Sequence, residues 1–467
     1  MKFDMKKQII YMLCATALLS SCHIYKSYDR PEDINTSGLY RDPVAENDTV
    51  VSDTTNFGNL PWKTVFTDPL LQSLIELGLK QNTDLQSAIL KVKEAQAPLL
   101  AAKLAYAPSL ALSPQGTISS FNHKAASKTY SLPVAASWEI SLFGGILNTK
   151  RGAEVNVKQM QAYRQAVQTQ IIANVANMYY TLMMLDKQLE ISRETAEILK
   201  RNTEAMEAMK EGAMYNINSA GVEQSRAAYA QVLASLPDIE QSIREVENSL
   251  SVLLGQAPQS IKRSTLDAQS LPSEFSVGVP LQLLSNRPDI KAAEMALAAS
   301  YYNTNVARSN FYPKITLSGS AGWTNSAGST IINPGKFLAT AIGSLTQPLF
   351  YNGSNIAKLK IAKAQEAEAK LAFQQALLNA GSEVSNALSL YQTTSEKAES
   401  RKIQVEAAQK AANDTKELFN LGTSTYLEVL SAQQSYLSAQ ISQVSDTFDR
   451  MQAVVNLYQA LGGGRED

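Results

Sequence analysis

The stretch from Thr425 to Leu461 carries apolar residues at alternating spacings of three and four. Its members are Leu427, Leu430, Gln434, Leu437, Ile441, Val444, Phe448, Met451, Val455 and Tyr458, with Gln434 the one polar residue among them. This heptad pattern predicts a helix that packs along a partner helix. The run Gly462-Gly463-Gly464 follows and marks the expected end of the helix.

A longer helix and two short strands are predicted before it. Residues 355–421 are rich in Ala, Gln, Glu and Lys and contain no proline, and Gly422 separates them from the final helix. Residues 314–325 and 339–349 consist of small, hydroxyl-bearing and apolar side chains. Each segment is close to the ~9–11 residues that a tilted strand needs to cross a bilayer. The predicted order is strand, strand, long helix, long helix.

The first half of the chain repeats this order. Strands are predicted at about 109–120 and 130–142, and helices at about 148–210 and 219–254. Pro108 and Pro313 precede the first strand of each half and lie 205 residues apart (313 − 108), whereas glycine landmarks favour a shift of 207 to 210. We therefore expect an internal duplication whose alignment is fixed only to within a few residues.

These elements define a domain plan. It comprises a signal peptide at 1–21, a tether at 22–67, a first repeat at 68–255, a linker at 256–280 and a second repeat at 281–467. Asp68 followed by Pro69 predicts the start of the first helix, because a capping side chain precedes a residue that needs no N–H partner. Pro98 lies inside the next helical pattern and predicts a kink or a local break.

The amino terminus resembles a bacterial lipoprotein signal. Lys2, Lys6 and Lys7 precede an apolar run at 9–19, which is too short to span a membrane. The run ends in Leu-Ser-Ser-Cys, which resembles a lipobox in which Cys22 is acylated and becomes the first residue. An ordinary secretory signal with an incidental cysteine is the alternative. Export with a lipid anchor indicates a bacterial envelope.

Composition and missing motifs narrow the function. Charged residues make up 18% of the chain and the net charge is −1, which argues against a nucleic-acid partner. Cys14 would leave with the signal and Cys22 would carry lipid, so no disulfide is expected. The only histidines are His23 and His123, and there is no phosphate-binding glycine-rich loop. We expect no enzyme activity, no cofactor and no metal site, although carboxylate-only catalysis stays open.

The predicted strands cannot close a membrane barrel within one chain. Lipid offers no hydrogen-bond partner for an open sheet edge, and the smallest single-chain barrels have eight strands. If the four strands of one chain enter a membrane, two copies would supply eight and three copies twelve. The alternative is a pair of ordinary β-hairpins in a soluble domain. The long polar helices must stand in water, so a shared barrel continued by helix pairs would form a conducting tube.

Several segments, in this order, resemble the outer-membrane efflux duct family typified by TolC and OprM, in its lipoprotein (NodT-type) branch. They are the lipobox at Cys22, Trp62, Phe66-Thr67-Asp68-Pro69-Leu70, Asn82-Thr83-Asp84-Leu85, Asn286-Arg287-Pro288-Asp289-Ile290, Phe311-Tyr312-Pro313, Pro348-Leu349-Phe350 with Gly353, and Ala460-Leu461-Gly462-Gly463-Gly464. The resemblance implies a mainly α fold with a small β part. It also implies a homotrimer with a twelve-stranded outer-membrane barrel and a periplasmic helical barrel.

The resemblance also implies two functional regions. The turns at Gly212, Ala213 and Met214 and at Leu421, Gly422, Thr423 and Ser424 match the family's adaptor-docking tips. Glu428 matches an acidic position at the family's pore mouth, Ser431 stands where a second Asp is usual, Gly221 holds the corresponding place in the first repeat, and Gln434 would contribute to closure. The alternative is that these are ordinary hairpin turns and a solvated helix face. With fewer carboxylates per subunit, a ring of these residues around the pore mouth would bind cations more weakly.

The expected function is a passive outer-membrane duct for small molecules. Its partners would be a periplasmic adaptor and an inner-membrane pump of the resistance–nodulation–division (RND) type, which the lipobox and Arg287-Pro288-Asp289 favour. One alternative is a duct for exported polypeptides in a type I secretion system. Another is a coiled-coil lipoprotein that tethers envelope layers and does not conduct.

Overall fold

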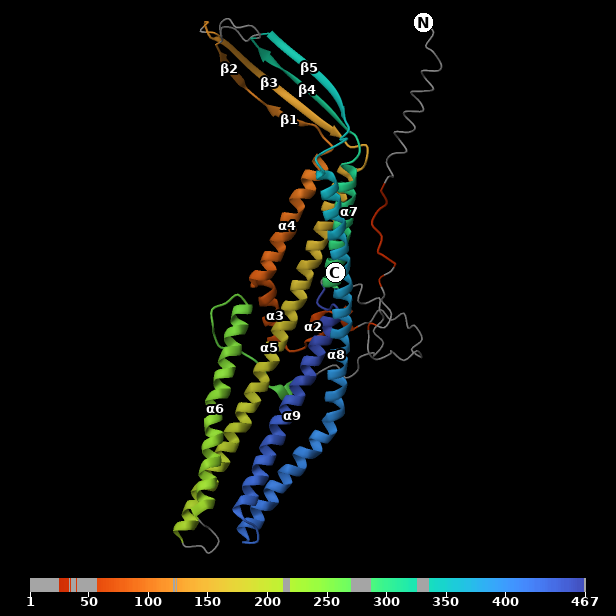
Figure 1. Cartoon of the computed structure of the whole chain (residues 1–467). Helices are drawn as coiled ribbons and strands as arrows, with labels where there is room; N and C mark the ends of the chain where they lie inside the picture. Colours follow the sequence, from red (N-terminus) through yellow and green to blue (C-terminus); the bar gives the residue numbers. More distant parts are fainter. Residues whose placement is uncertain are drawn as a thin grey trace. The chain divides into compact units, whose positions relative to one another are not determined.

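A computed structural model describes residues 25–32, 34, 39, 57–120, 122, 124–212, 219–269, 287–325 and 336–465 (Figure 1). The signal peptide, Cys22 and both histidines lie outside these residues. The chain divides into two compact units. The first, here the sheet unit, is Met1–Asn35, Leu90–Ala162 and Lys291–Gln375; the second, here the helical unit, is Thr36–Ile89, Tyr163–Ile290 and Ala376–Asp467.

The helices of the two repeats match in length and confirm the duplicated plan. The described helices are η2 (Phe57–Asn59), α2 (Trp62–Val65), α3 (Pro69–Gln81), α4 (Thr83–Leu104), α5 (Gly145–Glu211), α6 (Ser219–Leu253), η3 (Leu266–Ala268), α7 (Pro288–Ser309), α8 (Ser354–Asn420) and α9 (Tyr426–Ala460). Helices α4 and α7 have 22 residues each, α5 and α8 have 67 each, and α6 and α9 have 35 each. None of the described helices is long and apolar enough to cross a membrane.

Helix α4 continues through Pro98, so of the two outcomes predicted there the local break is wrong and the kink stays a prediction. Proline removes one backbone N–H, which leaves the carbonyl of Glu94 without its intrahelical donor. Both Pro98 and Glu94 are exposed. Water can therefore satisfy the free carbonyl, and the helix continues.

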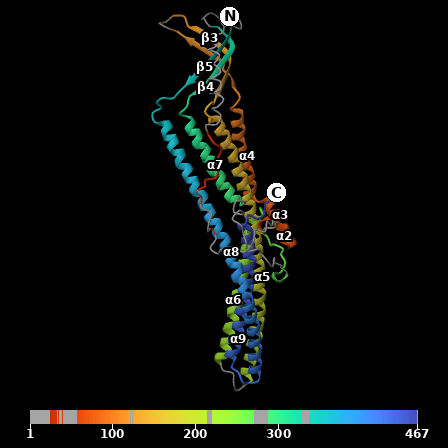
Figure 2. The same ribbon diagram turned by 90° about the vertical axis from the view of Figure 1, so that its right-hand side faces the viewer.

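One antiparallel sheet contains all the described strands. They are β1 (Ser109–Leu112), β2 (Gln115–Ser119), β3 (Ser127–Ile140), β4 (Lys314–Thr324) and β5 (Lys336–Thr346). Their order is β1-β3-β4-β5, with β2 also paired to β3; Figure 2 shows β3, β4 and β5 together. The continuous strand predicted at 109–120 is thus interrupted at Ser113-Pro114. There the Ser113 N–H still donates to the Pro133 carbonyl at 3.1 Å, but two prolines so close leave too few donors for a regular ladder.

The register separates the residues of the sheet into two chemically different faces. Directly paired residues point to the same side, and neighbours along a strand alternate. One side, the apolar face, carries Leu110, Leu112, Gly116, Ile118, Tyr130, Leu132, Val134, Ala136, Trp138, Ile140, Ile315, Leu317, Gly319, Ala321, Trp323, Phe337, Ala339, Ala341, Gly343 and Leu345, with Lys128 at its margin. The other, the hydroxyl face, carries mainly serine and threonine, with Leu338 and Ile342 as large apolar exceptions.

The apolar face is bare within one chain. Leu110, Ile118 and Leu345 are 71%, 72% and 68% exposed. Apolar patches of this extent mark a surface that contacts a membrane or a partner.

The main core of the helical unit lies where α2, α3, α5, α6 and α9 meet. Its largest fully buried side chains include Phe66, Leu71, Tyr179, Leu250 and Tyr458. The Tyr458 hydroxyl donates to the Leu60 carbonyl at 2.7 Å and accepts from the Gly464 N–H at 2.8 Å. A Cβ at Gly463 would lie 2.5 Å from the Tyr458 ring, so the terminal glycines are needed for close packing at the end of α9.

Arg287 fixes the same end of α9. Its guanidinium donates to the Ala460 carbonyl at 2.9 Å, to Glu383 at 2.6 Å, and to both carboxylate oxygens of Asp289. The side chain is 7% exposed. The Arg-Pro-Asp sequence therefore holds helices together in this chain.

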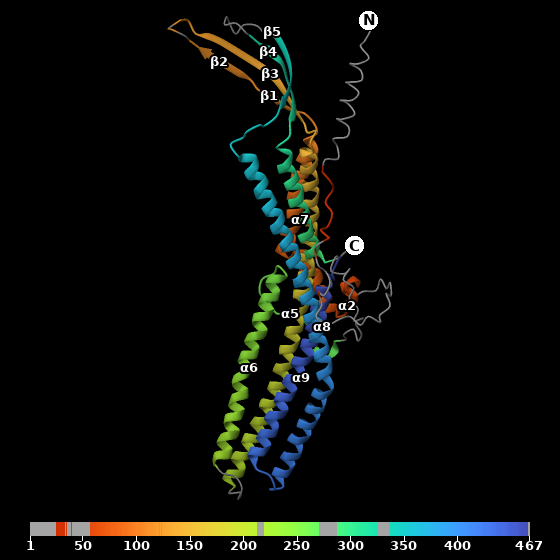
Figure 3. The same ribbon diagram turned by 45° about the vertical axis from the view of Figure 1, so that its right-hand side comes forward.

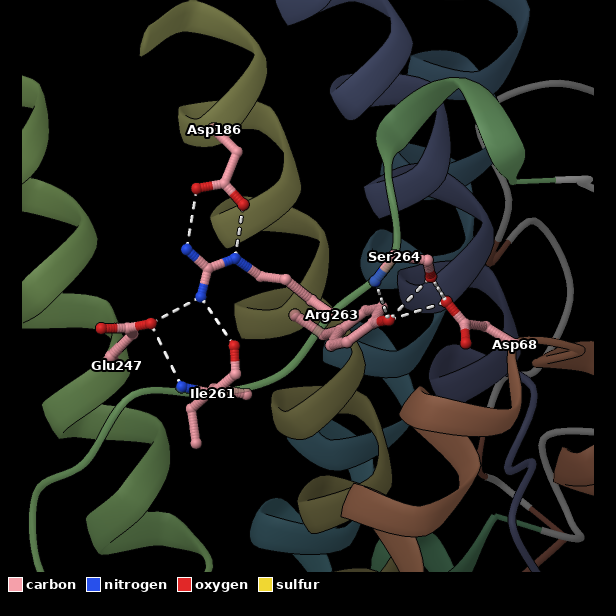
Figure 4. Close-up of polar contacts among 7 residues, drawn as sticks. Asp68, Asp186, Glu247, Ile261, Arg263 and Ser264 are labelled. Carbon is pink, nitrogen blue, oxygen red and sulfur yellow. Dashed lines mark hydrogen bonds and ion pairs between the residues drawn. The ribbon is translucent and has the colours of Figure 1, made fainter. Parts of the chain in front are cut away.

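The linker between the repeats is fixed by two consecutive side chains. Arg263 donates to the two oxygens of Asp186 at 2.5 and 2.7 Å and to Glu247 at 2.5 Å (Figure 4). Glu247 also accepts from the Ile261 N–H at 3.1 Å. The side chains of Arg263 and Glu247 are only 13% and 15% exposed. These bonds join the linker to α5 and α6; the bond to Glu247 is little screened by solvent, whereas Asp186 is 40% exposed.

Ser264, next in the chain, belongs to a second network centred on Asp68. One Asp68 oxygen accepts from the Leu70 N–H at 2.8 Å, which confirms the predicted cap of α3. The other oxygen accepts from the hydroxyls of Tyr179, at 2.7 Å, and Ser264, and from Gln269 at 2.9 Å. One carboxylate thus connects α3, α5 and the linker.

The charge of Asp68 is stabilised by these bonds. Burial alone would raise the pKa of the Asp68 carboxyl, but the hydrogen bonds from Ser264, Tyr179, the Leu70 N–H and Gln269 outweigh burial and lower it. A folded-state pKa below the unfolded value means that ionised Asp68 stabilises the fold above that unfolded value, about 3.9. The contribution is lost as pH falls through the folded pKa.

Asp68→Asn is expected to lower the stability of the folded chain by about 1–3 kcal/mol at pH 7, because buried donors lose a charged acceptor. Melting temperatures in detergent at pH 7 and at acid pH below the pKa of Asp68 measure the effect, and the gap between wild type and variant should shrink in acid. Asp414→Asn, exposed on α8, is the matched control and should not change melting. A gap that stays equal at both pH values would contradict the role of the charge.

Candidate gate and docking tips

The turn between α8 and α9 closes α8 with a Schellman motif. The Thr423 N–H donates to the Leu418 carbonyl at 3.0 Å and the Gly422 N–H to the Phe419 carbonyl at 2.9 Å. Gly422 has a φ of 74°, a conformation that glycine adopts without strain. Leu421 is 76% exposed beside it. The break predicted at Gly422 therefore forms a tight, ordered tip with an apolar side chain in solvent.

Glu428 belongs to the cap of α9. Its carboxylate accepts from the Thr425 N–H at 2.8 Å and from the Ser424 hydroxyl, while the Thr425 hydroxyl accepts from the Glu428 N–H at 3.4 Å. This reciprocal pair is a capping box. Hydrogen bonds from Ser424 and the Thr425 N–H lower the pKa of the Glu428 carboxyl, so the group is ionised at neutral pH.

The other predicted gate residues lie on α9 and α6. Ser431 and Gln434 follow Glu428 at helical spacings of three, and all three side chains are exposed on α9. Gly221 lies in the first turn of α6 and is partly buried. One chain presents a strip of polar residues here, and a ring of carboxylates would need further copies. The gate assignment of these residues stays a prediction.

The first tip is described only in part. Gly212 is exposed, and its N–H donates to the Ala208 carbonyl at 3.0 Å. Ala213 and Met214 lie outside the described residues. The docking role of both turns stays a prediction.

A buried chain of hydroxyls near the tips was not predicted from the sequence. The Ser225 hydroxyl lies 2.7 Å from that of Thr203 and 2.7 Å from that of Tyr426, and Thr203 also donates to the Leu199 carbonyl at 2.8 Å. This chain of hydroxyls joins α5, α6 and α9. It therefore links the helical hairpin α5–α6 to the helical hairpin α8–α9, whose helices are labelled in Figure 3. The one sequence signal was Ser225, which stands three residues after Val222 and four before Tyr229, at the spacing of apolar heptad positions.

An apolar cluster surrounds these hydroxyls. Its buried members are Leu199, Met206, Val222, Ala228, Tyr426, Val429 and Leu430, and Phe419 packs against them. Leu427, which the heptad pattern places among the packed residues, is instead 58% exposed. With Leu418 and Leu421 it forms an exposed apolar group at this tip. Among the described residues no group of His, Cys, Asp or Glu could hold a metal ion.

Among the described residues the amphipathic sheet has no partner at its β1/β2 edge or its β5 edge, which is typical of a subunit that builds a membrane channel together with further copies. The family model described as "Outer membrane efflux protein" matches residues 74–256 and 279–463. The chain belongs to this family, whose members are efflux channels and not enzymes.

Curated relatives and a solved structure agree with this assignment. The cation efflux system protein CusC of Escherichia coli K12 is 27% identical over 461 residues, covering 97% of this chain and 98% of CusC. The probable outer membrane lipoprotein SilC of Salmonella typhimurium is 28% identical over 412 residues, covering 86% and 88%. The outer-membrane channel OprN superposes with a TM-score of 0.84 at 27% identity, covering 95% and 99%.

Tyr426→Phe is expected to loosen the contact between the hairpins, because Ser225 loses a buried partner at a cost of about 1–2 kcal/mol. Hydrogen exchange of the amides in 199–232 and 418–433 should become measurably faster than in wild type. Tyr229→Phe, in the same cluster, is the matched control and should leave exchange unchanged. Equal protection in both variants would show that the hydroxyl chain does not hold the hairpins together.

Proposed function

We propose that three copies of this chain form an outer-membrane efflux duct by joining their sheets into one barrel. The observation that carries the proposal is the sheet itself, which has one apolar face, one hydroxyl face and two edges that no other described strand pairs with. The β1/β2 edge differs from the β5 edge, so copies associate head to tail. Head-to-tail contacts that close give a ring, and three copies of four strand passes give the twelve strands that the family resemblance implies.

The hydroxyl face would line the pore. Serine and threonine side chains solvate polar solutes without fixed charge. Glu139 and Lys314, an ion pair at 3.3 Å, lie on this face at the helical end of β3 and β4. Such a lining offers little selection, so selection would come from the pump that loads the duct.

The helix pairs would continue the duct through the periplasm and meet a periplasmic adaptor at their tips. The exposed leucines 418, 421 and 427 supply apolar surface for docking. The adaptor would in turn engage an inner-membrane pump of the RND type, which provides the energy. The duct itself is passive, and docking would shift the hairpins from a closed to an open arrangement.

Glu428 would narrow the closed pore mouth electrostatically. In a ring its ionised carboxylate recurs once per copy, while Ser431, Gln434 and Gly221 add no charge. Cations would therefore bind this ring weakly and block current from the tip side.

Acylation of Cys22 would anchor each copy to the membrane. The segment that follows is held on the sheet unit: the Tyr28 N–H donates to the Tyr302 hydroxyl at 3.1 Å, and Arg30 pairs with Glu294 at 2.7 and 2.8 Å. The Tyr25 ring packs beside Gly144, between β3 and α5.

Small molecules are the proposed cargo. CusC is named for cation efflux and matches 97% of this chain, and SilC is named a probable outer membrane lipoprotein and matches 86%. A strain that lacks this chain should become more susceptible to toxic small molecules, and the intact gene should restore resistance. Unchanged susceptibility together with loss of a secreted protein would instead support a polypeptide duct.

Glu428→Gln is expected to weaken cation block of single channels in planar bilayers, because glutamine preserves the capping box and removes only the charge. Glu428→Ala should weaken block as well and also loosen the start of α9. Glu417→Gln, exposed at the same tip, is the control. Unchanged block in both Glu428 variants would remove Glu428 from the gate, and a preparation without conductance would point to a non-conducting tether.

A further inference from the structure

Two constant shifts relate the repeats around the sheet. Helix α4, Pro108 and the start of β1 correspond to α7, Pro313 and the start of β4 with a shift of 205. The left-handed glycine and helix start at Gly144-Gly145 correspond to Gly353-Ser354 with a shift of 209. The alignment that the sequence left loose is therefore defined on both sides of the sheet.

Independent contacts obey the same two shifts. Ser109 lies opposite Ser137 in the first hairpin, and Lys314 lies opposite Thr346 in the second. The indole N–H of Trp138 donates to the Tyr106 carbonyl at 3.1 Å. The amide of Gln347 donates to the Phe311 carbonyl at 3.0 Å. These residues correspond by 205 or 209, so the two hairpins are copies in register as well as in order.

The junction between the hairpins inside one chain shows how such hairpins join. There β3 of the first pairs with β4 of the second, with Ile140 opposite Ile315 and Pro133 opposite Gly322. The strand equivalent to β3 is β5, and the strand equivalent to β4 is β1 with β2. The same junction can therefore recur between β5 of one copy and β1/β2 of the next.

We propose that β5 pairs with β1/β2 of a second copy of this chain in the register set by the repeat. Ala341 then lies opposite Ile118, Ile342 opposite Thr117 and Thr340 opposite Ser119. The inference rests on the proposed ring. It names the surface and the register by which neighbouring copies join.

The faces of the sheet agree with this register. Ile118, 72% exposed in one chain, and Ala341, also exposed, cover each other on the apolar side. Pairs such as Thr340 with Ser119 continue the hydroxyl side. A shift of two residues would preserve both faces, so amphipathicity alone does not select the register. The repeat selects it.

Helix packing supports the same neighbour. Inside one chain α5 packs on α7, where a Cβ at Gly152 would lie 3.5 Å from the Tyr302 Cβ. The shifts place Ile361 of α8 at the Gly152 position and Ala97 of the next copy's α4 at the Tyr302 position. Ile361 is 57% exposed and Ala97 is exposed. Glycine against tyrosine becomes isoleucine against alanine, so a large residue still meets a small one.

The pair Ile342 and Thr117 is suited to a disulfide. Ser113 directs its N–H toward β3, and Thr117, four residues on in the same register, does so too. The backbone of Thr117 is thus turned away from the neighbouring copy, which makes the pair across the junction the non-hydrogen-bonded kind, with closer side chains. The two cysteines of the sequence are Cys14, in the predicted signal, and Cys22, so the background is low.

The test is oxidative cross-linking of the full chain in membranes, read on non-reducing gels. Ile342→Cys with Thr117→Cys should give linked chains at least about tenfold faster than Ile342→Cys with Ser119→Cys, two residues out of register. Ile361→Cys with Ala97→Cys tests the helix contact, and each single variant must keep wild-type conductance.

The outcomes separate this inference from the proposed function. Faster linking of the offset pair would overturn the proposed register and leave the ring intact. An absence of cross-links in particles with the mass of three chains would also overturn the register alone. A particle with the mass of one chain overturns the ring, and this inference with it.

Discussion

The free edges of the sheet are the constraint on which the structure depends. In hydrocarbon an unpaired backbone N–H or C=O costs several kcal/mol, and the β5 edge and the β1/β2 edge each present a row of them. The apolar face favours contact with lipid, but the unpaired edges make insertion of a single chain into lipid unfavourable. The association of copies proposed above would resolve this conflict, and the hydroxyl face would then line a pore.

Elements and their order could be predicted because local chemistry sets them. Gly422 marks a helix end since its backbone needs a positive φ, and Asp68 caps α3 through a neighbour two residues away. The errors came from interactions that a linear pattern does not contain. Ser113-Pro114 interrupts a strand because Pro133 lies across from it, and α4 continues through Pro98 because solvent surrounds it. The heptad pattern marked Leu427 and Gln434 as packed, but both are exposed.

The candidate site was located more easily than its chemistry. Its turns follow from glycine positions, whereas the hydroxyl chain joins Thr203, Ser225 and Tyr426, which are 22 and 201 positions apart. No periodic pattern of apolar residues in the sequence predicts such a contact. Glu428, in contrast, has a sequence signal, because its spacing of three residues from Thr425 predicts a capping box. Its proposed role at a pore rests on its charge. Arg287 resembled a family marker, and the structure shows it holding α9 through the Ala460 carbonyl.

The number of chains in a conducting particle tests the account most directly. Native mass spectrometry of the mature, lipidated protein, taken from the detergent fraction that forms channels in bilayers, counts them. The account predicts three chains in every active particle and no conductance from lone chains. A conducting particle of one chain, or a stable single chain in water with no channel activity, would contradict it.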